Sequence, residues 1–545
     1  MCHEHLTGYL TLGTFGMHGT PAQSRGHQTL ATLQTTKLAA WTRECGRGQP
    51  SLAPIGAWLL AISVYYAFIT SAGTFELVSW HTDYYDLLVQ GWREGHLYLP
   101  ITPKPRLLAR ANPYNYRYVR DWLWDASLYN RHYYLYWGPA PGLCLWFFKA
   151  ITGYADKVHD QWLVLWFMLI RLYAGAALII AYARAQAPQL PSWARQLAIL
   201  VFGLASPTLY FMARPLIYEA SISAGQAFVF LGLLLAYFGA QRPRARTRCF
   251  VLAGICFAFA LSSRGSLIVV TPLLVVVTAI AANREAGYPR RSIARDLLAL
   301  GLPVALAIAL NLIYNKLRFD SFSEFGLKYQ LTSPPFKSEG RFVLPNIVSY
   351  LTSAVAWSCK FPFARLPVKR HLTTWITWPE DYDPGDWSKG ERTAGILFAT
   401  SVCWLWLMWL WRWRTTGQRL RSLPNPSQRV LMSWRELWLL GCSLALLCGL
   451  APASRMWMAN ARFLEDASGG ILLGAIGGGF WLLTRVQRTQ LWIPRALGTG
   501  LFAALGLHSI VVGLLLGFTG HMNNFGEQNP ELFKQLVAEF SMCRR

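Results

Sequence analysis

Charged side chains are scarce in this chain of 545 residues, and acidic side chains are the scarcer kind. Only 14% of the residues are charged, with 27 Asp and Glu against 51 Lys and Arg, whereas 53% are hydrophobic. The mean hydropathy is +0.26. Soluble globular chains carry about 25% charged residues, so this composition excludes that class. The chain is therefore predicted to be a polytopic membrane protein.

Paired cysteine motifs are lacking as well. None of the ten Cys are spaced as CxxC, and five lie inside apolar runs, where a thiol behaves as a small hydrophobic group. The pattern predicts neither a disulfide framework nor a zinc site. Residues 1–50 lack the basic and then apolar layout of a cleavable signal peptide, and we expect a disordered cytoplasmic tail there.

Long apolar runs separated by short basic clusters set the expected topology. The net charge of +24 does not indicate a nucleic-acid partner, because the basic residues form no single stripe. Segments near 20 apolar residues are long enough to span a membrane. Eleven spans are predicted, at 54–72, 162–183, 197–212, 220–239, 249–263, 266–283, 296–314, 394–411, 436–452, 467–484 and 496–517. A cytoplasmic N-terminus then puts every strongly basic loop inside and the C-terminus outside.

This topology divides the chain into consecutive parts. They are the cytoplasmic tail at 1–50, a transmembrane module at 51–320 with an outer loop at 73–161, an extracytoplasmic loop at 321–393, C-terminal transmembrane helices at 394–517 and an extracytoplasmic tail at 518–545. The predicted fold class is all-α, a bundle of about eleven transmembrane helices with an outward-facing cavity. The apolar stretch Gly138–Tyr154 is too short to span, so we expect it on or in the outer leaflet.

Carboxylates gather in the outer loop at 73–161 among many Trp and Tyr. Such a carboxylate, held where aromatic rings meet water, is suited to bind a sugar and accept a proton. Asp83 is the first candidate base, and it would share a cavity-facing helix face with Asp86. Alternatively, Asp83 is only the N-cap of that helix, with Asp86 in its first turn. Asp125 is the second candidate base, and its alternative is an Asx-turn.

Several arginines are candidates for contacts with a phosphate group. Arg264 stands between two apolar runs on the outer side, where an unpaired charge is expensive, so we expect it to have an anionic partner. Arg214 and Arg462 are similar candidates, because guanidinium groups suit bidentate phosphate contacts. For Arg462 the alternative is local pairing with Glu465 or Asp466 at helical spacing.

Glu219 follows Pro215 and is expected to open a helix. It is either a favourable charge at the helix N-terminus or a substrate-binding group. No metal site is predicted. If a divalent cation such as Mg²⁺ or Mn²⁺ binds, Glu219 with Asp83 or Asp86 would be the expected oxygen ligands.

The order of these features resembles that of the GT-C superfamily of membrane glycosyltransferases. After the acidic outer loop comes an aromatic-Gly-Pro segment with Tyr136, Trp137, Gly138 and Pro139, and then a second outer turn with Arg214 and Glu219. The motifs are most similar to those of the bacterial branch with protein mannosyltransferases, aminoarabinose transferases and lipopolysaccharide-core transferases. The resemblance covers roughly residues 54–319. The adjacent acidic pair common after the first span is replaced by Asp83 and Asp86, so the identity of the base stays open. The segments at 314–331 and 460–470 also look like family signatures.

The resemblance implies transfer of a sugar from a polyprenyl-phosphate donor to a lipid, glycan or protein acceptor. Tyr136 and the arginines would bind substrate, with membrane lipid as a further partner. The expected location is a bacterial inner membrane, with the site on the extracytoplasmic face and the oligomeric state left open. The alternative is a lipid-linked glycan flippase, ligase or transporter without glycosyl transfer.

Overall fold

The structure is a computed structural model that describes residues 53–76, 83–284, 290–332, 337–366, 376–382, 393–421, 432–520 and 523–543. The predicted tail at 1–50 lies outside the described residues. The chain divides into two units, residues 1–54 and 55–545. Of the first unit only Ala53 and Pro54 are described, and they begin helix α2 (Ala53–Thr70).

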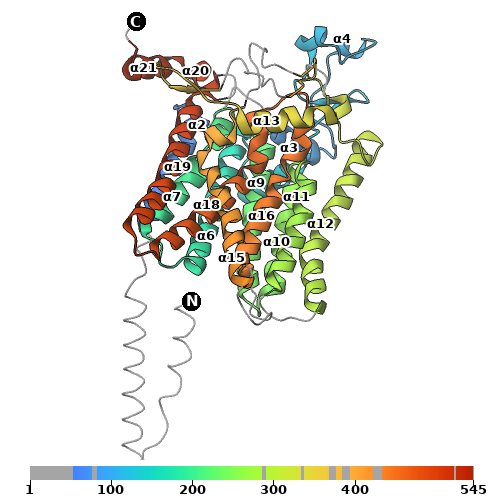
Figure 1. Ribbon diagram of the computed structural model, residues 1–545. Helices are drawn as coiled ribbons and strands as arrows, with labels where there is room; N and C mark the ends of the chain where they lie inside the picture. The colour runs from blue at the N-terminus through green and yellow to red at the C-terminus, as the bar shows by residue number, and fades with distance from the viewer. Residues whose placement is uncertain are drawn as a thin grey trace, which may run out of the picture. The chain divides into compact units, whose positions relative to one another are not determined.

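Within the described residues, nine helical segments are long and apolar enough to cross a membrane. They are α2, α6 (Asp160–Gln186), α7 with α8 (Ser192–Leu204 and Thr208–Met212), α9 (Ile217–Gln241), α10 (Arg246–Ser263), α12 (Arg290–Phe319), α16 with α17 (Trp434–Leu447 and Leu450–Ser454), α18 with its preceding 3-10 turn (Glu465–Gln487 and Ala461–Leu464) and α19 (Trp492–Thr519). The helices of residues 55–545 form a bundle (Figure 1). The predicted all-α polytopic membrane class is confirmed.

Two of the predicted spans take other forms. The range 266–283 becomes α11 (Leu267–Ala282), which is apolar but only 16 residues long. The range 394–411 breaks into α14 (Ile396–Ala399), a 3-10 helix (Ser401–Trp406) and α15 (Leu407–Arg421). At the break the chain bonds to neighbouring segments, because the Val402 backbone N–H donates to Ser509 Oγ at 2.9 Å and Thr400 Oγ1 donates to the Ser206 carbonyl at 2.7 Å.

The apolar stretch Gly138–Tyr154 contains α5 (Ala140–Thr152), which has 13 residues and ends at Gly153 in the left-handed conformation. At about 1.5 Å per residue, the helix is close to 20 Å long and falls short of a bilayer core. Its Trp146 and Phe147 side chains are exposed. The predicted shortness is therefore confirmed, and its depth in the bilayer remains a prediction.

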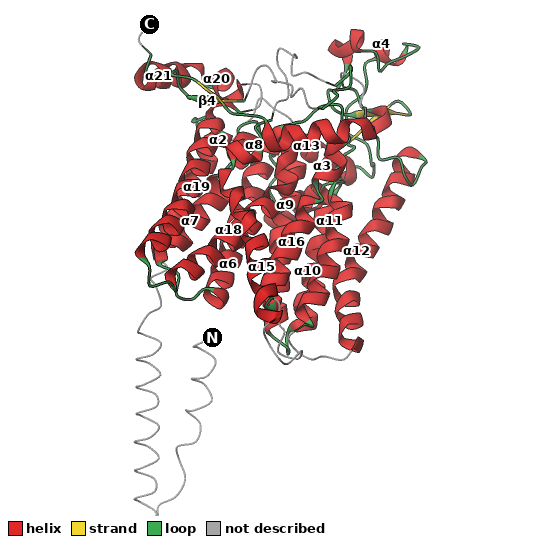
Figure 2. Ribbon diagram, in the orientation of Figure 1, coloured by secondary structure: helices red, strands yellow, loops and turns green. Residues whose placement is uncertain are grey.

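Short elements and loops cover one end of the bundle (Figure 2). They include α3 (Tyr84–Arg93), α4 (Pro105–Leu108), the hairpin of β1 and β2 (Ser127–Tyr129 and His132–Tyr134), α13 (Val343–Thr352), the pair β3 and β4 (Ala356–Trp357 and Ala364–Arg365), α20 (Asn524–Gln528) and α21 (Pro530–Phe540). A disulfide joins Cys359 to Cys543 with their Cα atoms 5.5 Å apart. The prediction of no disulfide was therefore wrong for this pair, which is far apart in sequence and is brought together only by folding.

A buried ion pair ties the helices together beneath this covered end. Arg171 of α6 and Glu465 of α18 are fully buried, with Nη2 and Oε1 3.2 Å apart. Ser468 and Thr208 complete the cluster, by accepting from Arg171 at 2.9 Å and donating to Glu465 at 3.2 Å. Charges inside a membrane bundle need such partners. The pair thus holds the start of α18 in place, next to the site described below.

Candidate active site

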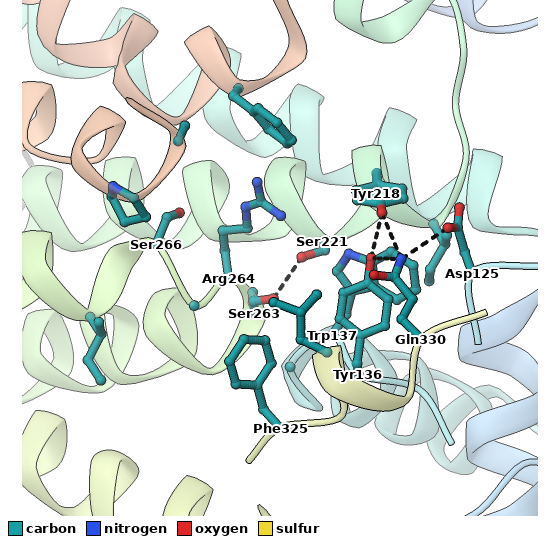
Figure 3. A pocket seen from close by; sticks show the side chains of 18 of the residues that line it. Asp125, Tyr136, Trp137, Tyr218, Ser221, Ser263, Arg264, Ser266, Phe325 and Gln330 are labelled. Carbon is teal, nitrogen blue, oxygen red and sulfur yellow. Dashed lines mark hydrogen bonds between the residues drawn. The ribbon is translucent and has the colours of Figure 1, made fainter. Parts of the chain in front are cut away.

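A cavity of about 1320 Å³ lies beneath the loops, where α9, α10, α12 and α18 meet the hairpin segment. Figure 3 shows 18 of its lining side chains, with the labelled polar ones reaching from Ser266 and Arg264 on one side to Gln330 and Asp125 on the other. Its size exceeds the range of about 300–1000 Å³ that is usual for small-molecule pockets. The cavity is therefore larger than a single small ligand requires.

Asp125 sits in this cavity on a strained stretch of backbone. Its φ is +62°, in the left-handed region that Asp and Asn tolerate better than most residues. Its backbone N–H donates to the Leu331 carbonyl at 3.0 Å, and the Leu331 N–H donates to the Ala126 carbonyl at 2.9 Å. These two hydrogen bonds join segments far apart in the sequence and fix the backbone that carries the Asp125 carboxylate. Non-glycine residues in such conformations cluster at functional sites.

Gln330 connects Asp125 to two tyrosines. Its amide Nε2 lies 3.1 Å from Asp125 Oδ1, 2.9 Å from Tyr136 Oη and 3.1 Å from Tyr218 Oη. The two hydroxyls are 2.6 Å apart. Figure 3 shows these four side chains converging at one end of the cavity. The network fixes the carboxylate and presents hydroxyl groups suited to a sugar.

Aromatic rings line the same end. Tyr136 stacks on Trp137 with ring centroids 3.8 Å apart, and Trp137 meets Tyr218 edge-on at 4.6 Å. Tyr84 donates from its hydroxyl to the Trp124 carbonyl. Burial, reinforced by Tyr218 and Asp125, raises the pKa of Tyr136 well above its usual value near 10. Tyr136 is therefore a neutral hydrogen-bonding group at any physiological pH.

Arg264 has the anionic partner that the sequence predicted. Its Nε lies 3.2 Å from Asp466 Oδ2, and Ser266 Oγ donates to the same oxygen at 3.0 Å. Arg264 ends α10, and both charged residues line the cavity. The pair therefore keeps a guanidinium group at the cavity wall in the apolar bundle.

Arg462 pairs across the bundle rather than locally. Its Nη1 lies 3.6 Å from Glu219 Oε1, and its guanidinium lies over the Tyr218 ring, 4.3 Å from the centroid. Glu219 also accepts from the Leu216 backbone N–H at 3.2 Å in the first turn of α9. The predicted helix-start position of Glu219 is therefore confirmed. The local alternative for Arg462 was wrong, because Glu465 and Asp466 pair with Arg171 and Arg264.

Arg318 of α12 is a cavity residue that the sequence did not single out. It is 3% exposed, and its guanidinium donates to the Leu135 carbonyl and to Asn315 Oδ1. It also lies over the rings of Tyr314 and Phe319, 3.9 and 4.8 Å from the centroids, and its Nε donates to the Tyr314 carbonyl at 3.4 Å. Among the residues that the structure describes, no carboxylate forms an ion pair with Arg318. A buried guanidinium without a counter-charge favours an anionic ligand.

Asp83 and Asp86 do not line the cavity, so the prediction that their helix face points into it was wrong. Asp83 is the N-cap residue of α3 and pairs with Lys157 at 2.5 Å, which raises the lysine pKa. Asp86 pairs with the buried Lys149 of α5 at 2.5 Å. The carboxylate of Asp160 accepts from the first backbone N–H groups of α3. This face of α3 therefore anchors α5 and the loop after it.

The predicted cation ligands do not meet. Glu219 pairs with Arg462, while Asp83 and Asp86 pair with Lys157 and Lys149. No group of three or more His, Cys, Asp or Glu side chains is arranged to hold a metal ion in the described part of the chain. These residues therefore do not fit a divalent-cation site.

Part of the cavity wall is apolar and is exposed on the flank of the bundle. Ile268 of α11 and Leu312 of α12 both line it and are 48% and 40% exposed. Phe322 and Phe325 continue this wall and are exposed as well. The exposed flank of a membrane-spanning bundle faces lipid, so these apolar side chains are suited to contact with a hydrocarbon chain.

Several lining residues lie in the two later segments that look like family signatures, and of these only Arg462 was predicted to bind substrate. Arg318 and Gln330 come from the segment at 314–331, and Arg462 and Asp466 from the one at 460–470. Arg214 also lines the cavity, and its contact with a phosphate group remains a prediction. The composition of the two segments was the signal that could have identified residues such as Arg318 and Gln330, since each segment mixes charged and aromatic residues beside an apolar span.

No protein-family model and no curated protein sequence matches the chain. Solved structures that are similar include the oligosaccharyltransferase of Archaeoglobus fulgidus in its apo form, at 14% identity and a TM-score of 0.42 over 85% of this chain. Its structure tethered with an acceptor peptide containing the NVT sequon has 13% identity and a TM-score of 0.41 over 85%. The third, AglB with an inhibitory peptide and a dolichol-phosphate, has 13% identity and a TM-score of 0.41 over 84%. The chain spans 56% of the length of each of these chains.

Proposed function

We propose that the protein transfers a glycosyl group from a polyprenyl-phosphate-linked donor to a lipid, glycan or protein acceptor on the extracytoplasmic face of a membrane. The observation that carries the proposal is the content of one cavity. Asp125, hydrogen-bonded aromatic groups, the buried Arg318 and exposed apolar side chains all belong to it. Each matches one part of the reaction.

The donor phosphate is assigned to the arginines. Arg318 carries a positive charge without a carboxylate partner in the described residues, and Arg264 stands at the same cavity with its charge shared by Asp466. Guanidinium groups bind phosphate through paired hydrogen bonds and stabilise the charge that develops on it as it leaves. The prenyl chain follows the apolar wall out between α11 and α12.

Asp125 is the proposed general base. The acceptor oxygen or nitrogen attacks the anomeric carbon and gives its proton to the Asp125 carboxylate. The bond from that carbon to the phosphate oxygen breaks, and its electron pair leaves with polyprenyl phosphate. Gln330 keeps Asp125 in position, and Tyr136 and Tyr218 bind sugar hydroxyls. General-base assistance typically contributes about 10²–10⁴ in rate.

Asp83 and Asp86 remain candidates from the sequence, but their ion pairs with lysines support a positioning role. Losing either one would loosen α3, which carries Tyr84 into the cavity. The proposal therefore predicts milder effects from changes at 83 and 86 than at 125.

The test is a transfer assay in liposomes with purified full-length protein. The donor is a polyprenyl-phosphate hexose labelled in the sugar, and a bacterial envelope extract supplies acceptors. We expect label in an acceptor fraction and release of polyprenyl phosphate, both dependent on Asp125. The rival function of a flippase predicts movement of a labelled lipid between leaflets without release of polyprenyl phosphate. Lipid movement that survives Asp125→Asn, with no transfer by the unmodified protein, would overturn the proposal.

A further inference from the structure

A second, smaller cavity lies in the described residues at the other end of the bundle. It has a volume of about 310 Å³ and is enclosed by the ends of α6, α15, α16 and α18. Figure 1 shows α15 at the end opposite to α3 and α13. The cavity contains none of the residues that line the first one.

The length of α18 places this cavity at the opposite membrane boundary. Asp466, in its first turn, lines the first cavity, while Arg485 lines the second. Nineteen residues of α-helix rise about 28 Å, which matches a hydrocarbon core of about 30 Å. Trp481 lines the second cavity and meets Trp411 edge-on, with ring centroids 5.3 Å apart. Tryptophans of this kind mark a membrane–water interface.

The charge of the cavity wall is positive. Arg412, Arg485 and Arg488 line it together with the carboxylate of Glu436. Glu436 is held by Arg412 in a two-point ion pair, with both N–O distances 3.2 Å, and also accepts from the Ser433 backbone N–H at 2.9 Å. Within the described residues, Arg485 and Arg488 form no ion pair. Two guanidinium groups thus remain for a ligand.

A buried hydroxyl without a hydrogen-bond partner also lines this cavity. Thr484 Oγ1 is buried at the wall of this cavity, and it has no hydrogen-bond partner among the described residues. Arginines in the last turn of α18 are also favourable to the helix dipole, which explains their charge without any ligand. The dipole does not explain a polar cavity beside them with a buried hydroxyl left unsatisfied.

We propose that this cavity binds the phosphate of an anionic membrane lipid in the leaflet opposite the candidate active site. Arg485 and Arg488 would bind the phosphate oxygens, and Thr484 would donate to one of them. The volume suits a phosphoglycerol headgroup, while the acyl chains follow the exposed apolar face of α15, including Leu407, Leu410 and Trp411. Basic pockets between transmembrane helices on this kind of face are suited to anionic lipid headgroups.

The test uses purified full-length protein in detergent with phosphatidylglycerol added at graded mole fractions, and bound lipid is counted by native mass spectrometry. We expect Arg485→Gln with Arg488→Gln to weaken binding by about 30-fold, equivalent to about 2 kcal/mol at 1.4 kcal/mol per tenfold. The matched control removes two charges outside the cavity, by Arg248→Gln with Arg495→Gln, and should change binding by less than about 3-fold.

Thr484→Val tests the cavity itself, because it changes no charge and keeps the side-chain shape. Loss of one hydrogen bond should weaken binding by about 3- to 10-fold. Equal losses in the arginine pair and the control pair, or unchanged binding in Thr484→Val, would overturn the proposal. Phosphatidylcholine should bind no more than background. Displacement of phosphatidylglycerol by millimolar inorganic phosphate, with equal retention of the free ion, would show a phosphate-ion site and overturn the lipid assignment.

Discussion

Asn at position 125 is the sharpest test of the candidate active site, because it changes the chemistry and little else. Asn tolerates the left-handed backbone that Asp125 adopts at φ +62°. Its amide oxygen can still accept from Gln330 Nε2, now 3.1 Å from Asp125 Oδ1. A neutral hydrogen bond contributes about 0.5–1.5 kcal/mol, so the folded protein should lose no more than about 1 kcal/mol. The carboxylate proposed to take the acceptor's proton is nevertheless gone.

We expect Asp125→Asn to lower the transfer rate by about 10²–10⁴, which corresponds to about 3–5 kcal/mol in the activation barrier. Donor affinity should be nearly unchanged, because it rests on the arginines and the apolar wall. Single-turnover transfer and equilibrium donor binding would be measured on the same preparation. A variant that lost rate and affinity together would indicate damage to the fold rather than loss of a base.

Asp83→Asn is the matched control, since it removes the same charge from the same outer region. Asp83 pairs with Lys157, whose side chain is 58% exposed, and exposed ion pairs are worth about 0–1 kcal/mol. We expect near-normal transfer from this variant. If Asp83→Asn abolished transfer while Asp125→Asn retained it, the base would belong to α3 and the reasoning from the cavity would be refuted.

Further predictions concern the phosphate site, the tyrosine network and the covered end. Arg318→Gln should weaken donor binding by about 10- to 100-fold, because bonds to charged groups are worth about 1.5–3 kcal/mol, and Arg117→Gln on the exposed surface should leave donor binding unchanged. Tyr136→Phe should slow transfer by the same factor at pH 6 and pH 9, because the raised pKa of Tyr136 keeps its hydroxyl protonated throughout; a loss confined to one pH would contradict this. Cys359 and Cys543 should resist alkylation in intact cells until a reductant is added, as expected for a disulfide on the extracytoplasmic side. Labelling of Cys359 without reduction would place that end of the bundle in a reducing compartment.

The sequence by itself determined the class of protein and the approximate position of nearly every span. Apolar runs are a local property that needs no partner, because the bilayer requires about 20 consecutive apolar residues wherever a helix crosses. The same reasoning identified α5 as too short and showed that Arg264 needs an anionic partner. These conclusions depend on composition along one segment and the cost of an unpaired charge, and neither requires knowledge of which helices are neighbours.

Only the tertiary structure decided which polar residues meet. Asp83 and Asp125 are both acidic residues in one outer loop, yet one pairs with a lysine and the other faces the cavity. The partners that distinguish them, Lys157 and Gln330, are 74 and 205 residues away from them in the sequence. The cross-bundle pairing of Arg462 with Glu219 arises in the same way. Spacing along a helix predicts contacts within one turn or two, whereas these contacts depend on how separate helices and loops pack against one another.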